Sequence, residues 1–400
     1  MTNWQDDASR DLMSLGGRLA LLTHGEGSHV WDADGTRYLD FLGGIAVNCL
    51  GHAHPVFVDA VARQAATLAH VSNYFASPGQ LELAARLKRL AGTGGQGRVF
   101  LTNSGTEANE TAIKLARLHG NKSGRQTILV VRGAFHGRTM GALSLTPKAA
   151  YRDPFLPVLP DIRTVERSLE SLEAAFDGTV AAMVVEPIQG EAGVVPLPEG
   201  FLARARELTT QHDALLILDE VQTGSGRTGE WFAFQGLGIE PDAVTLAKSI
   251  GAGFPLGALI TFGPASDLFY PGTHNSTFGG NPLAAAVANA VLGHIEDEGL
   301  LANVTARGAE LRAGIAELPL VTGTRGAGLL IGITLSQPVA AQVREEAQRR
   351  GLIVNAITED VIRIAPAYTI GDAEVAEFLD LFGQALGAVA STLTPTETLA

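Results

Sequence analysis

The stretch that decides the fold is AVTLAKSIGAGFP, residues 243–255. Its first part is short and apolar, which is typical of a buried strand, and the glycines and proline that follow are typical of a loop. Lys248 stands at the junction, and ligands of open parallel sheets bind outside the carboxyl ends of strands. Removal from water favours the neutral amine, which suits attack on a carbonyl group. A surface lysine whose stem lies along apolar surface remains the alternative.

A second apolar run, Leu215–Leu218, ends in Asp219. The acid and Lys248 stand about 30 residues apart, which fits one strand–helix–strand step. Both groups are then expected at the same edge of a sheet. There Asp219 would hold the proton of a pyridinium nitrogen and keep a cofactor ring electron-poor. An acid that caps the following segment is the alternative.

A third piece, NSGTEANE at residues 103–110, precedes a helical run. Ser104 and Glu107 have the spacing of a capping box, a structural motif at a helix start. The glycine and the hydroxyls at this helix start also suit a phosphate, because free backbone N–H groups and the helix dipole attract anions. The two interpretations are compatible.

The order of elements along the chain predicts an α/β fold. Asp34-Gly35 is a turn signal between two short runs, so residues 29–40 are expected to form a hairpin. From residue 98 onward, short β-type runs alternate with helical ones, which predicts a mostly parallel sheet between helices. After about residue 282 a second α+β unit is expected, with strands at 328–335, 352–355 and 361–364. We therefore predict a large domain at 51–289 and a small domain formed by 1–50 and 290–400. The expected strands of the large sheet are 99–101, 127–131, 182–185, 215–218, 243–246 and 256–261.

Composition narrows the class of function. The formal net charge is −13, and no local Lys/Arg cluster offsets it, so neither nucleic acid nor an anionic membrane is an expected partner. The single cysteine, Cys49, is expected to be a buried small hydrophobe. No signal peptide or membrane-spanning run is evident, so a cytoplasmic location is expected. His52 and His54 lack the acidic or thiol company of a metal site, and Gly251 and Gly253 lack the continuation of a dinucleotide motif, so no metal and no NAD are expected.

Seven motifs together resemble the class III (subgroup II) aminotransferases, which depend on pyridoxal phosphate (PLP). The resemblance spans about residues 31–369 and implies the aspartate-aminotransferase-like fold type I, with a mostly parallel seven-stranded sheet in the large domain. Within this class, the pattern is most similar to the acetylornithine aminotransferases of arginine biosynthesis. The motifs are NSGTEANE (103–110), AFHGRTMG (134–141), VVEPIQGEAGV (184–194), LILDEVQTGSGRTG (216–229), TLAKSIGAGFPLGA (245–258), STFGGNPLA (276–284) and IRIAPA (362–367).

The resemblance implies a role for each matching residue of the cofactor site. Lys248 matches the lysine that binds PLP covalently and then moves a proton, and Asp219 matches the acid on the ring nitrogen. Gln222 matches the partner of the ring hydroxyl. The remaining cofactor residues are the phosphate cradle and the two ring faces: Ser104, Gly105, Thr106, Phe135 and Val221. Thr277 matches a residue that reaches the phosphate of the other subunit, so a homodimer with shared sites is implied.

Two arginines are implied to bind the carboxylates of glutamate and 2-oxoglutarate, since the planar guanidinium pairs well with carboxylates. Arg363 matches the residue that binds the α-carboxylate, and Arg138 the one that binds the distal carboxylate. Glu191 matches a glutamate that masks the first arginine when an ω-amine enters. Ser276, beside Thr277, is a further substrate-site candidate. His136 is expected to pack or hydrogen-bond rather than act as a base.

Two departures from the ornithine aminotransferases bear on the substrate. Ile45 and Ala76 replace tyrosines that hold the free amino-acid end of ornithine, and this favours an acylated amine. The resemblance therefore implies transfer of the ω-amino group of N-acetylornithine to 2-oxoglutarate. Ornithine, 4-aminobutyrate and other ω-amino acids are alternative donors. An aminomutase or decarboxylase on the same fold, and a PLP-binding relative without turnover, are the alternatives from other classes.

Overall fold

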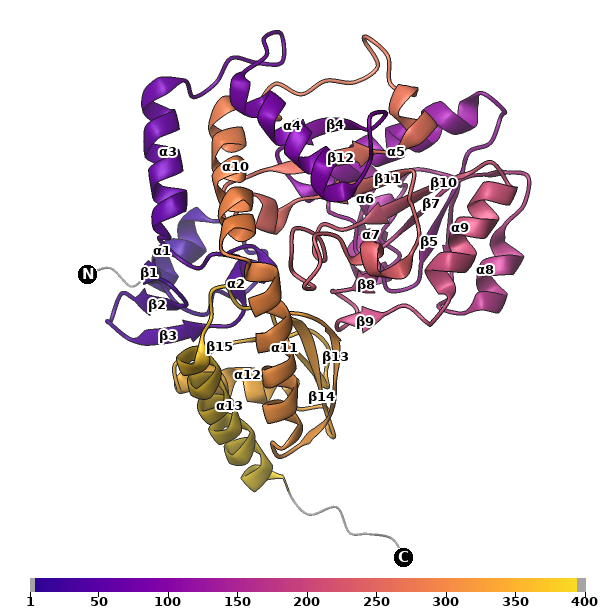
Figure 1. Ribbon diagram of the computed structural model, residues 1–400. Helices are drawn as coiled ribbons and strands as arrows, with labels where there is room; N and C mark the ends of the chain where they lie inside the picture. The colour runs from indigo at the N-terminus through magenta and orange to yellow at the C-terminus, as the bar shows by residue number, and fades with distance from the viewer. Residues whose placement is uncertain (1–3, 394–400) are drawn as a thin grey trace, which may run out of the picture.

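A sheet of seven strands forms the centre of the computed structural model, which describes residues 4–393 (Figure 1). The strand order is β4-β12-β11-β10-β7-β5-β6. Only β12 runs antiparallel to its neighbours, β11 and β4. The strands are β4 (Arg98–Thr102), β5 (Thr127–Val131), β6 (Ile162–Val165), β7 (Val180–Val185), β10 (Leu215–Asp219), β11 (Ala243–Leu246) and β12 (Gly257–Thr261).

Alternate side chains of these strands pack on opposite faces of the sheet. On β5, Ile128 and Val130 belong to one apolar cluster with α5 (Gly105–Asn121), whereas Leu129 and Val131 belong to the other. Both faces are therefore buried, which explains why the strand sequences are continuously apolar. The second cluster includes α9 (Phe201–Gln211) and α8 (Leu169–Ala175). Shorter elements near this sheet are α6 (Met140–Ser144), α7 (Ala149–Arg152), and the two-stranded β8 (Ile188–Gln189) with β9 (Val195–Pro196).

Both ends of the chain meet in a second unit. The hairpin of β2 (His29–Asp32) and β3 (Arg37–Asp40) lies in a sheet with β1 (Leu22–Glu26) and β15 (Leu352–Ile353), and β3 pairs with β15 in parallel. Figure 1 shows this hairpin beside the C-terminal elements. The rest of the unit is β13 (Val321–Ala327), β14 (Leu330–Leu335), β16 (Asn355–Ala356), β17 (Val361–Ile364), α11 (Leu300–Ala316), α12 (Ala340–Arg349) and α13 (Asp372–Thr392). The exact domain boundaries, residues 51 and 289, stay a prediction.

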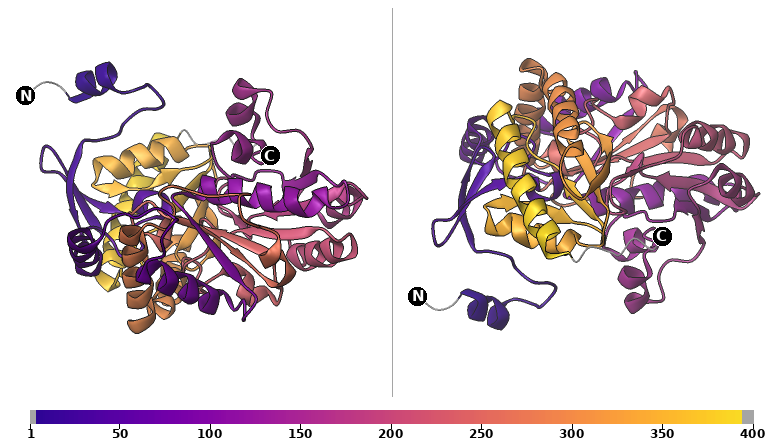
Figure 2. Two further views of the ribbon diagram at one scale, coloured as in Figure 1. Left: turned by 90° about the horizontal axis from the view of Figure 1, so that it is seen from above. Right: turned by 90° about the horizontal axis from the view of Figure 1, so that it is seen from below.

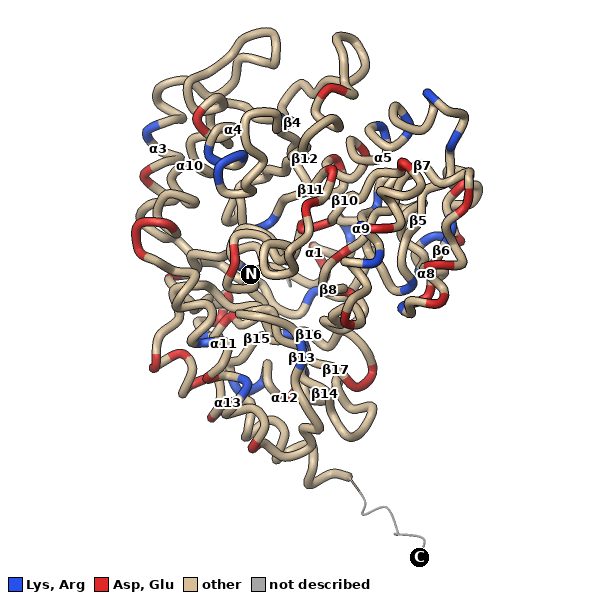
Figure 3. The backbone as a smooth tube through the Cα atoms, turned by 45° about the vertical axis from the view of Figure 1, so that its right-hand side comes forward, with Lys and Arg blue, Asp and Glu red and all other residues tan. Residues whose placement is uncertain are grey.

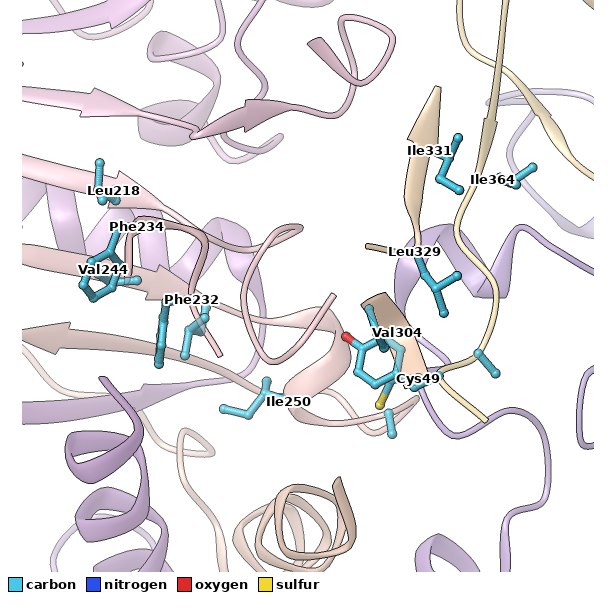
Figure 4. Close-up of a cluster of buried hydrophobic side chains, with 14 of the residues drawn as sticks. Cys49, Leu218, Phe232, Phe234, Val244, Ile250, Val304, Leu329, Ile331 and Ile364 are labelled. Atoms are coloured by element: carbon cyan, nitrogen blue, oxygen red, sulfur yellow. The ribbon is translucent and has the colours of Figure 1, made fainter. Parts of the chain in front are cut away.

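One apolar core joins the two units. Figure 4 shows it running from Leu218 and Val244 of the large sheet, past Cys49 and Val304, to Ile364 of the C-terminal sheet. Cys49 is fully buried, as expected for a small hydrophobe. Three helices lie against one another beside this core: α3 (Pro55–Thr67), α4 (Pro78–Ala91) and α10 (Pro282–Asp297). A continuous core holds the edges of both sheets at fixed positions around the site between them.

The expected mostly parallel seven-stranded sheet is confirmed. Two expectations about single strands were wrong, one in this sheet and one in the second unit. β6 was not predicted, because Arg163 and Thr164 interrupt its apolar pattern. The run expected at 352–355 is divided between β15 and β16, which join different sheets. Acidic and basic residues are interspersed along the backbone (Figure 3). Among residues 4–393, no helix combines the length and apolar character that crossing a bilayer requires.

Candidate active site

A cavity of about 390 Å³ opens where the parallel strands end. The residues following β7, β10 and β11 supply Glu186, Val221 and Lys248 to its wall, and Asp219 ends β10 itself. The volume suits a small cofactor with a substrate. Nine sequence-predicted residues line it together: Ser104, Gly105, Thr106, Phe135, Arg138, Glu191, Val221, Gln222 and Lys248, with Asp219 as the tenth.

Lys248 enters this cavity from a strained backbone. Its φ of 51° lies in the left-handed region, which costs a side-chain-bearing residue roughly 1 kcal/mol or more. The strain is tolerated because β11 ends two residues earlier and the short turn at Lys248–Ile250 begins there. Burial lowers the pKa of the Lys248 ammonium, and nearby Arg363 lowers it further, against the opposing charge of Asp219. The side chain is thereby brought closer to the neutral amine that a nucleophile requires.

Asp219 is a buried carboxylate with three donors. His136 Nδ1 and Asn109 Nδ2 lie 2.7 and 2.8 Å from Oδ2, and the Val221 N–H donates to Oδ1 at 3.0 Å. Burial alone would raise the pKa of Asp219, but His136 and the other donors outweigh it and leave this pKa below its usual value. Oδ1 accepts a single donor and keeps a lone pair for another. Asp219 is therefore ionised, and its Oδ1 can accept a hydrogen bond from a cationic group.

The start of α5 is built as an anion site. The Ser104 hydroxyl accepts the Glu107 N–H at 3.2 Å and so caps the helix. The expected capping box is only half present, because the Glu107 carboxylate accepts the N–H of Asn103 rather than that of Ser104. A Cβ on Gly105 would lie 2.8 Å from the Val221 side chain, so only glycine fits between the start of the helix and Val221. Ser104, Gly105 and Thr106 line the cavity, and the first N–H groups of a helix have no partner within the helix.

The loop 132–138 carries an aromatic ring and a cation to the same cavity. The Arg138 guanidinium lies 3.7 Å from the ring centroid of Tyr151 and 5.5 Å from that of Phe135. No acidic side chain of the described chain forms an ion pair with Arg138, so its charge is available to an anionic ligand. Thr106 and Thr139 hydroxyls, 2.7 Å apart, tie this loop to the start of α5.

Arg363, from the C-terminal unit, is not part of the cavity wall but lies next to it, where it bonds two of the lining residues, Glu191 and Gln222. It lies on β17, is 2% exposed, and donates to Glu191 at 2.5 Å and to Asn355 at 2.9 Å. Gln222 accepts a longer hydrogen bond from it, at 3.4 Å. The structure therefore brings Arg363 and Glu191 together as a pair. A buried guanidinium that loses its carboxylate partner needs another anion in its place.

Besides Arg363, two further sequence-predicted residues, Thr277 and Ser276, lie outside the cavity of this chain. Thr277 is exposed, and the Ser276 carbonyl accepts the Asn73 side-chain amide at 2.7 Å. Ile45, one of the two departures from the ornithine pattern, is 47% exposed. Asn275 accepts the Ser276 N–H at 2.8 Å, so it stabilises a local turn.

Sequence reasoning missed two polar residues of the site. Asn109 binds both Asp219 and the His136 carbonyl; it lies in the helical part of NSGTEANE, but that motif was interpreted only through its capping and phosphate-binding residues. Glu186 is 6% exposed and follows β7 as Asp219 ends β10. An acid at the end of an apolar run was the signal that identified Asp219, and the same signal at VVE (184–186) would have found Glu186.

Glu220 lies beside the site and anchors a loop rather than facing the cavity. It is fully buried and accepts the Thr223 hydroxyl and the backbone N–H groups of Ala233 and Phe234, at 2.6 to 3.0 Å. Burial raises the pKa of Glu220 to about 7. The folded protein therefore binds this proton more tightly than the unfolded chain, whose glutamates titrate near 4.3.

This difference predicts a pH-dependent stability. The contribution of Glu220 is complete below about pH 4 and is lost as the pH rises to about 7, with a size on the order of 3 kcal/mol. Glu220→Gln should be less stable than the parent at pH 4, and the gap should shrink or reverse by pH 7.5. Urea unfolding of both proteins across this range measures it. Glu230→Gln, at an exposed glutamate of the same loop, is the control, and parallel curves for parent and Glu220→Gln would contradict the prediction.

Known proteins resemble the chain over nearly its whole length. The family described as aminotransferase class-III matches residues 15–386. An acetylornithine aminotransferase of Streptomyces coelicolor is 52% identical over 93% of this chain and 92% of its own, and one of Mycobacterium bovis is 49% identical over 92% and 91%. Among solved structures, an N-acetylornithine aminotransferase of Stenotrophomonas maltophilia has a TM-score of 0.84 at 38% identity, covering 97% of this chain and 100% of its own. An ornithine aminotransferase of Toxoplasma gondii has a TM-score of 0.92 at 31% identity, covering 98% and 96%.

Proposed function

The chain belongs to the class-III aminotransferases, and we propose that it transfers the ω-amino group of N-acetylornithine to 2-oxoglutarate. The products are N-acetylglutamate 5-semialdehyde and glutamate. The observation that carries this proposal is the Arg363–Glu191 pair at the edge of a cavity that is also lined by the half-buried Lys248. Such a pair hides a carboxylate-binding arginine from one substrate and releases it for the other.

The cofactor of this family is pyridoxal phosphate, which supplies an aldehyde that exchanges with amines and a ring that withdraws electrons. The residues present fit it on three grounds. A Cβ on Gly105 would fill the space between the helix start and Val221. The carboxylate of Asp219 keeps a free lone pair, as a protonated ring nitrogen requires. Lys248 is half-buried, and its partial removal from water favours the neutral form.

We assign the following tasks to the residues of this chain. Lys248 binds the cofactor and, when its amine is free, holds and moves a proton at Nζ. Asp219 keeps its charge through His136 and Asn109 and so holds a proton on the ring nitrogen. The first turn of α5 binds the phosphate through its N–H groups. Phe135 and Val221 are assigned the two ring faces, and Gln222 the ring hydroxyl.

The two carboxylates of 2-oxoglutarate are assigned to Arg363 and Arg138. When the ω-amine of N-acetylornithine enters, Glu191 remains on Arg363 and neutralises it, so the positive charge does not oppose the incoming ammonium. When 2-oxoglutarate enters, its α-carboxylate replaces Glu191. One carboxylate thus replaces another on the buried guanidinium, so the charge of the pair is conserved and the free-energy cost of the exchange is low.

We also propose that the protein is a homodimer with shared sites and acts in the cytoplasm. Thr277 is exposed here, next to Phe278 with 59% exposure, and Tyr74 and Phe75 are exposed by 88% and 67%. Apolar side chains gathered in this way favour an interface with a second copy. The helix α1 (Trp4–Asp11) stands away from the body (Figure 2) and buries none of its residues, which also favours a partner surface.

The proposed amino donor is tested by measuring glutamate formation by the PLP-loaded protein. N-acetylornithine, ornithine and 4-aminobutyrate would be compared as donors with 2-oxoglutarate, each by kcat/KM. We expect N-acetylornithine to lead by about tenfold or more, because one extra apolar group that fills a pocket changes kcat/KM by roughly 10- to 200-fold. A higher kcat/KM for ornithine or 4-aminobutyrate would overturn the proposed substrate but leave the family assignment intact. Turnover without a keto acid would indicate an aminomutase or decarboxylase instead.

A further inference from the structure

Glu186 is a second buried acid at the wall of the cavity. Leu218 of β10 pairs with Val185 of β7, so Asp219 and Glu186 are the next residues along two neighbouring parallel strands. Glu186 is 6% exposed and lines the same cavity as Asp219 and Lys248. Two carboxyl groups so placed repel each other when both are ionised, so one of them holds a proton.

The donors around the pair decide which acid is charged. Asp219 accepts hydrogen bonds from His136, Asn109 and the Val221 N–H. Glu186 accepts one, from the Phe135 N–H to Oε2 at 3.1 Å. The charge therefore belongs to Asp219 and the proton to Glu186. Burial and the neighbouring Asp219 raise the pKa of Glu186 well above its usual range, in agreement with this assignment.

The single hydrogen bond of Glu186 holds a functional loop. Phe135 lies in that loop, and Arg138 follows three residues later. The loop is also fixed in the buried interior at His136, whose ring contacts Asp219 and whose backbone N–H and carbonyl bond Thr146 and Asn109. Oε1 of Glu186 has no hydrogen-bond partner in the part of the chain that the structure describes. One oxygen thus orients the loop, and the other is available toward the cavity.

We propose that Glu186 is a positioning residue that works as a neutral acid, holding the Phe135–Arg138 loop with Oε2 and presenting an O–H donor to the cofactor cavity with Oε1. This inference rests on the proposed function. Loss of the proton would place a second negative charge beside Asp219 and disturb the charge balance of the site. The charged or titratable groups that face Glu186 from the surrounding elements are Asp219, Lys248 and Glu191, with His136 and Arg138 on the loop that it holds.

Glu186→Gln tests the inference, because an amide keeps a neutral acceptor and a donor but cannot ionise. We expect kcat/KM within about threefold of the parent near pH 7.5. The visible absorption of the bound cofactor, titrated with alkali, should lose one transition that the parent shows. In infrared spectra at pH 7.5, the parent should show a protonated-carboxyl band that the variant lacks. Glu166→Gln is the matched control, since Glu166 follows β6 in the same way but its side chain is 55% exposed.

Glu186→Leu tests the positioning role, because leucine occupies a similar space but accepts no hydrogen bond. It leaves the Phe135 N–H without a partner, so we expect cofactor affinity to fall about tenfold and KM for 2-oxoglutarate, which Arg138 binds, to rise by a similar factor. A Glu186→Gln variant with kcat reduced a hundredfold, or with the alkaline transition intact, would overturn the inference. If both variants fail to fold, the infrared spectrum of Glu220→Gln at pH 7.5 decides, because the buried acid with a pKa of about 7 is then removed, and absence of a protonated-carboxyl band there is contrary evidence. A parent that binds no PLP would contradict the proposed function instead.

Discussion

Replacing Lys248 by alanine should reduce kcat by about 10³-fold or more. Proton transfer by one positioned side chain contributes roughly 10²- to 10⁴-fold, and this variant loses covalent attachment of the cofactor as well. The fold should persist, because the Lys248 side chain is only partly buried and forms no hydrogen bond or ion pair among residues 4–393. Turnover and the visible spectrum of the PLP-treated protein measure the two losses separately.

The matched control is Lys122→Ala, at an exposed lysine that caps the far end of α5. It should leave both readouts unchanged. An external amine of small size should restore part of the proton transfer in Lys248→Ala, because the deletion leaves space where Nζ stood. Retained turnover or a parent-like spectrum in Lys248→Ala would remove Lys248 from the role assigned to it.

Replacing Asp219 by asparagine should reduce kcat by roughly 10²- to 10⁴-fold. Removing one partner of a buried ionic pair costs about 3–5 kcal/mol, and each 1.36 kcal/mol is a factor of ten. The partner lost here is the protonated ring nitrogen, while His136 and Asn109 keep neutral hydrogen-bond partners. Steady-state kinetics give the loss. Calorimetric binding of PLP should show a fall in affinity as well.

Asp242→Asn is the comparison for this second prediction. Asp242 also pairs with a cation, Arg206, but at the opposite end of β10, where it accepts the Leu216 N–H. It should affect stability and leave kcat within about twofold. Equal losses of kcat in the two variants would mean that Asp219 acts through the stability of the sheet rather than on the ring.

Much of the site was predictable because its signals are local. Apolar runs that end in Lys248 and Asp219 identify strand ends, and parallel strands bring their carboxyl ends to one edge. The helix start at Ser104 follows from capping chemistry in the same way. These features need only a few consecutive residues and the general geometry of α/β sheets.

The rest depends on contacts between distant segments. Pairing of β3 with β15 joins residues more than three hundred positions apart, and no turn signal specifies it. Asn109 comes to Asp219 from the second turn of a helix, where its sequence neighbours show only that one face is buried. The strand β6 was missed because Arg163 lies within it and pairs at the surface with Asp177. Tertiary packing decides such features, and local pattern does not.

The most direct measurement of the central claim follows one nitrogen atom. N-acetylornithine labelled with ¹⁵N at its ω-amine would be incubated with the PLP-loaded protein and 2-oxoglutarate, and the products analysed by mass spectrometry. Our account predicts the label in the amino group of glutamate, with one glutamate formed for each semialdehyde. Label released as ammonium, or retained in a rearranged amine, would contradict it.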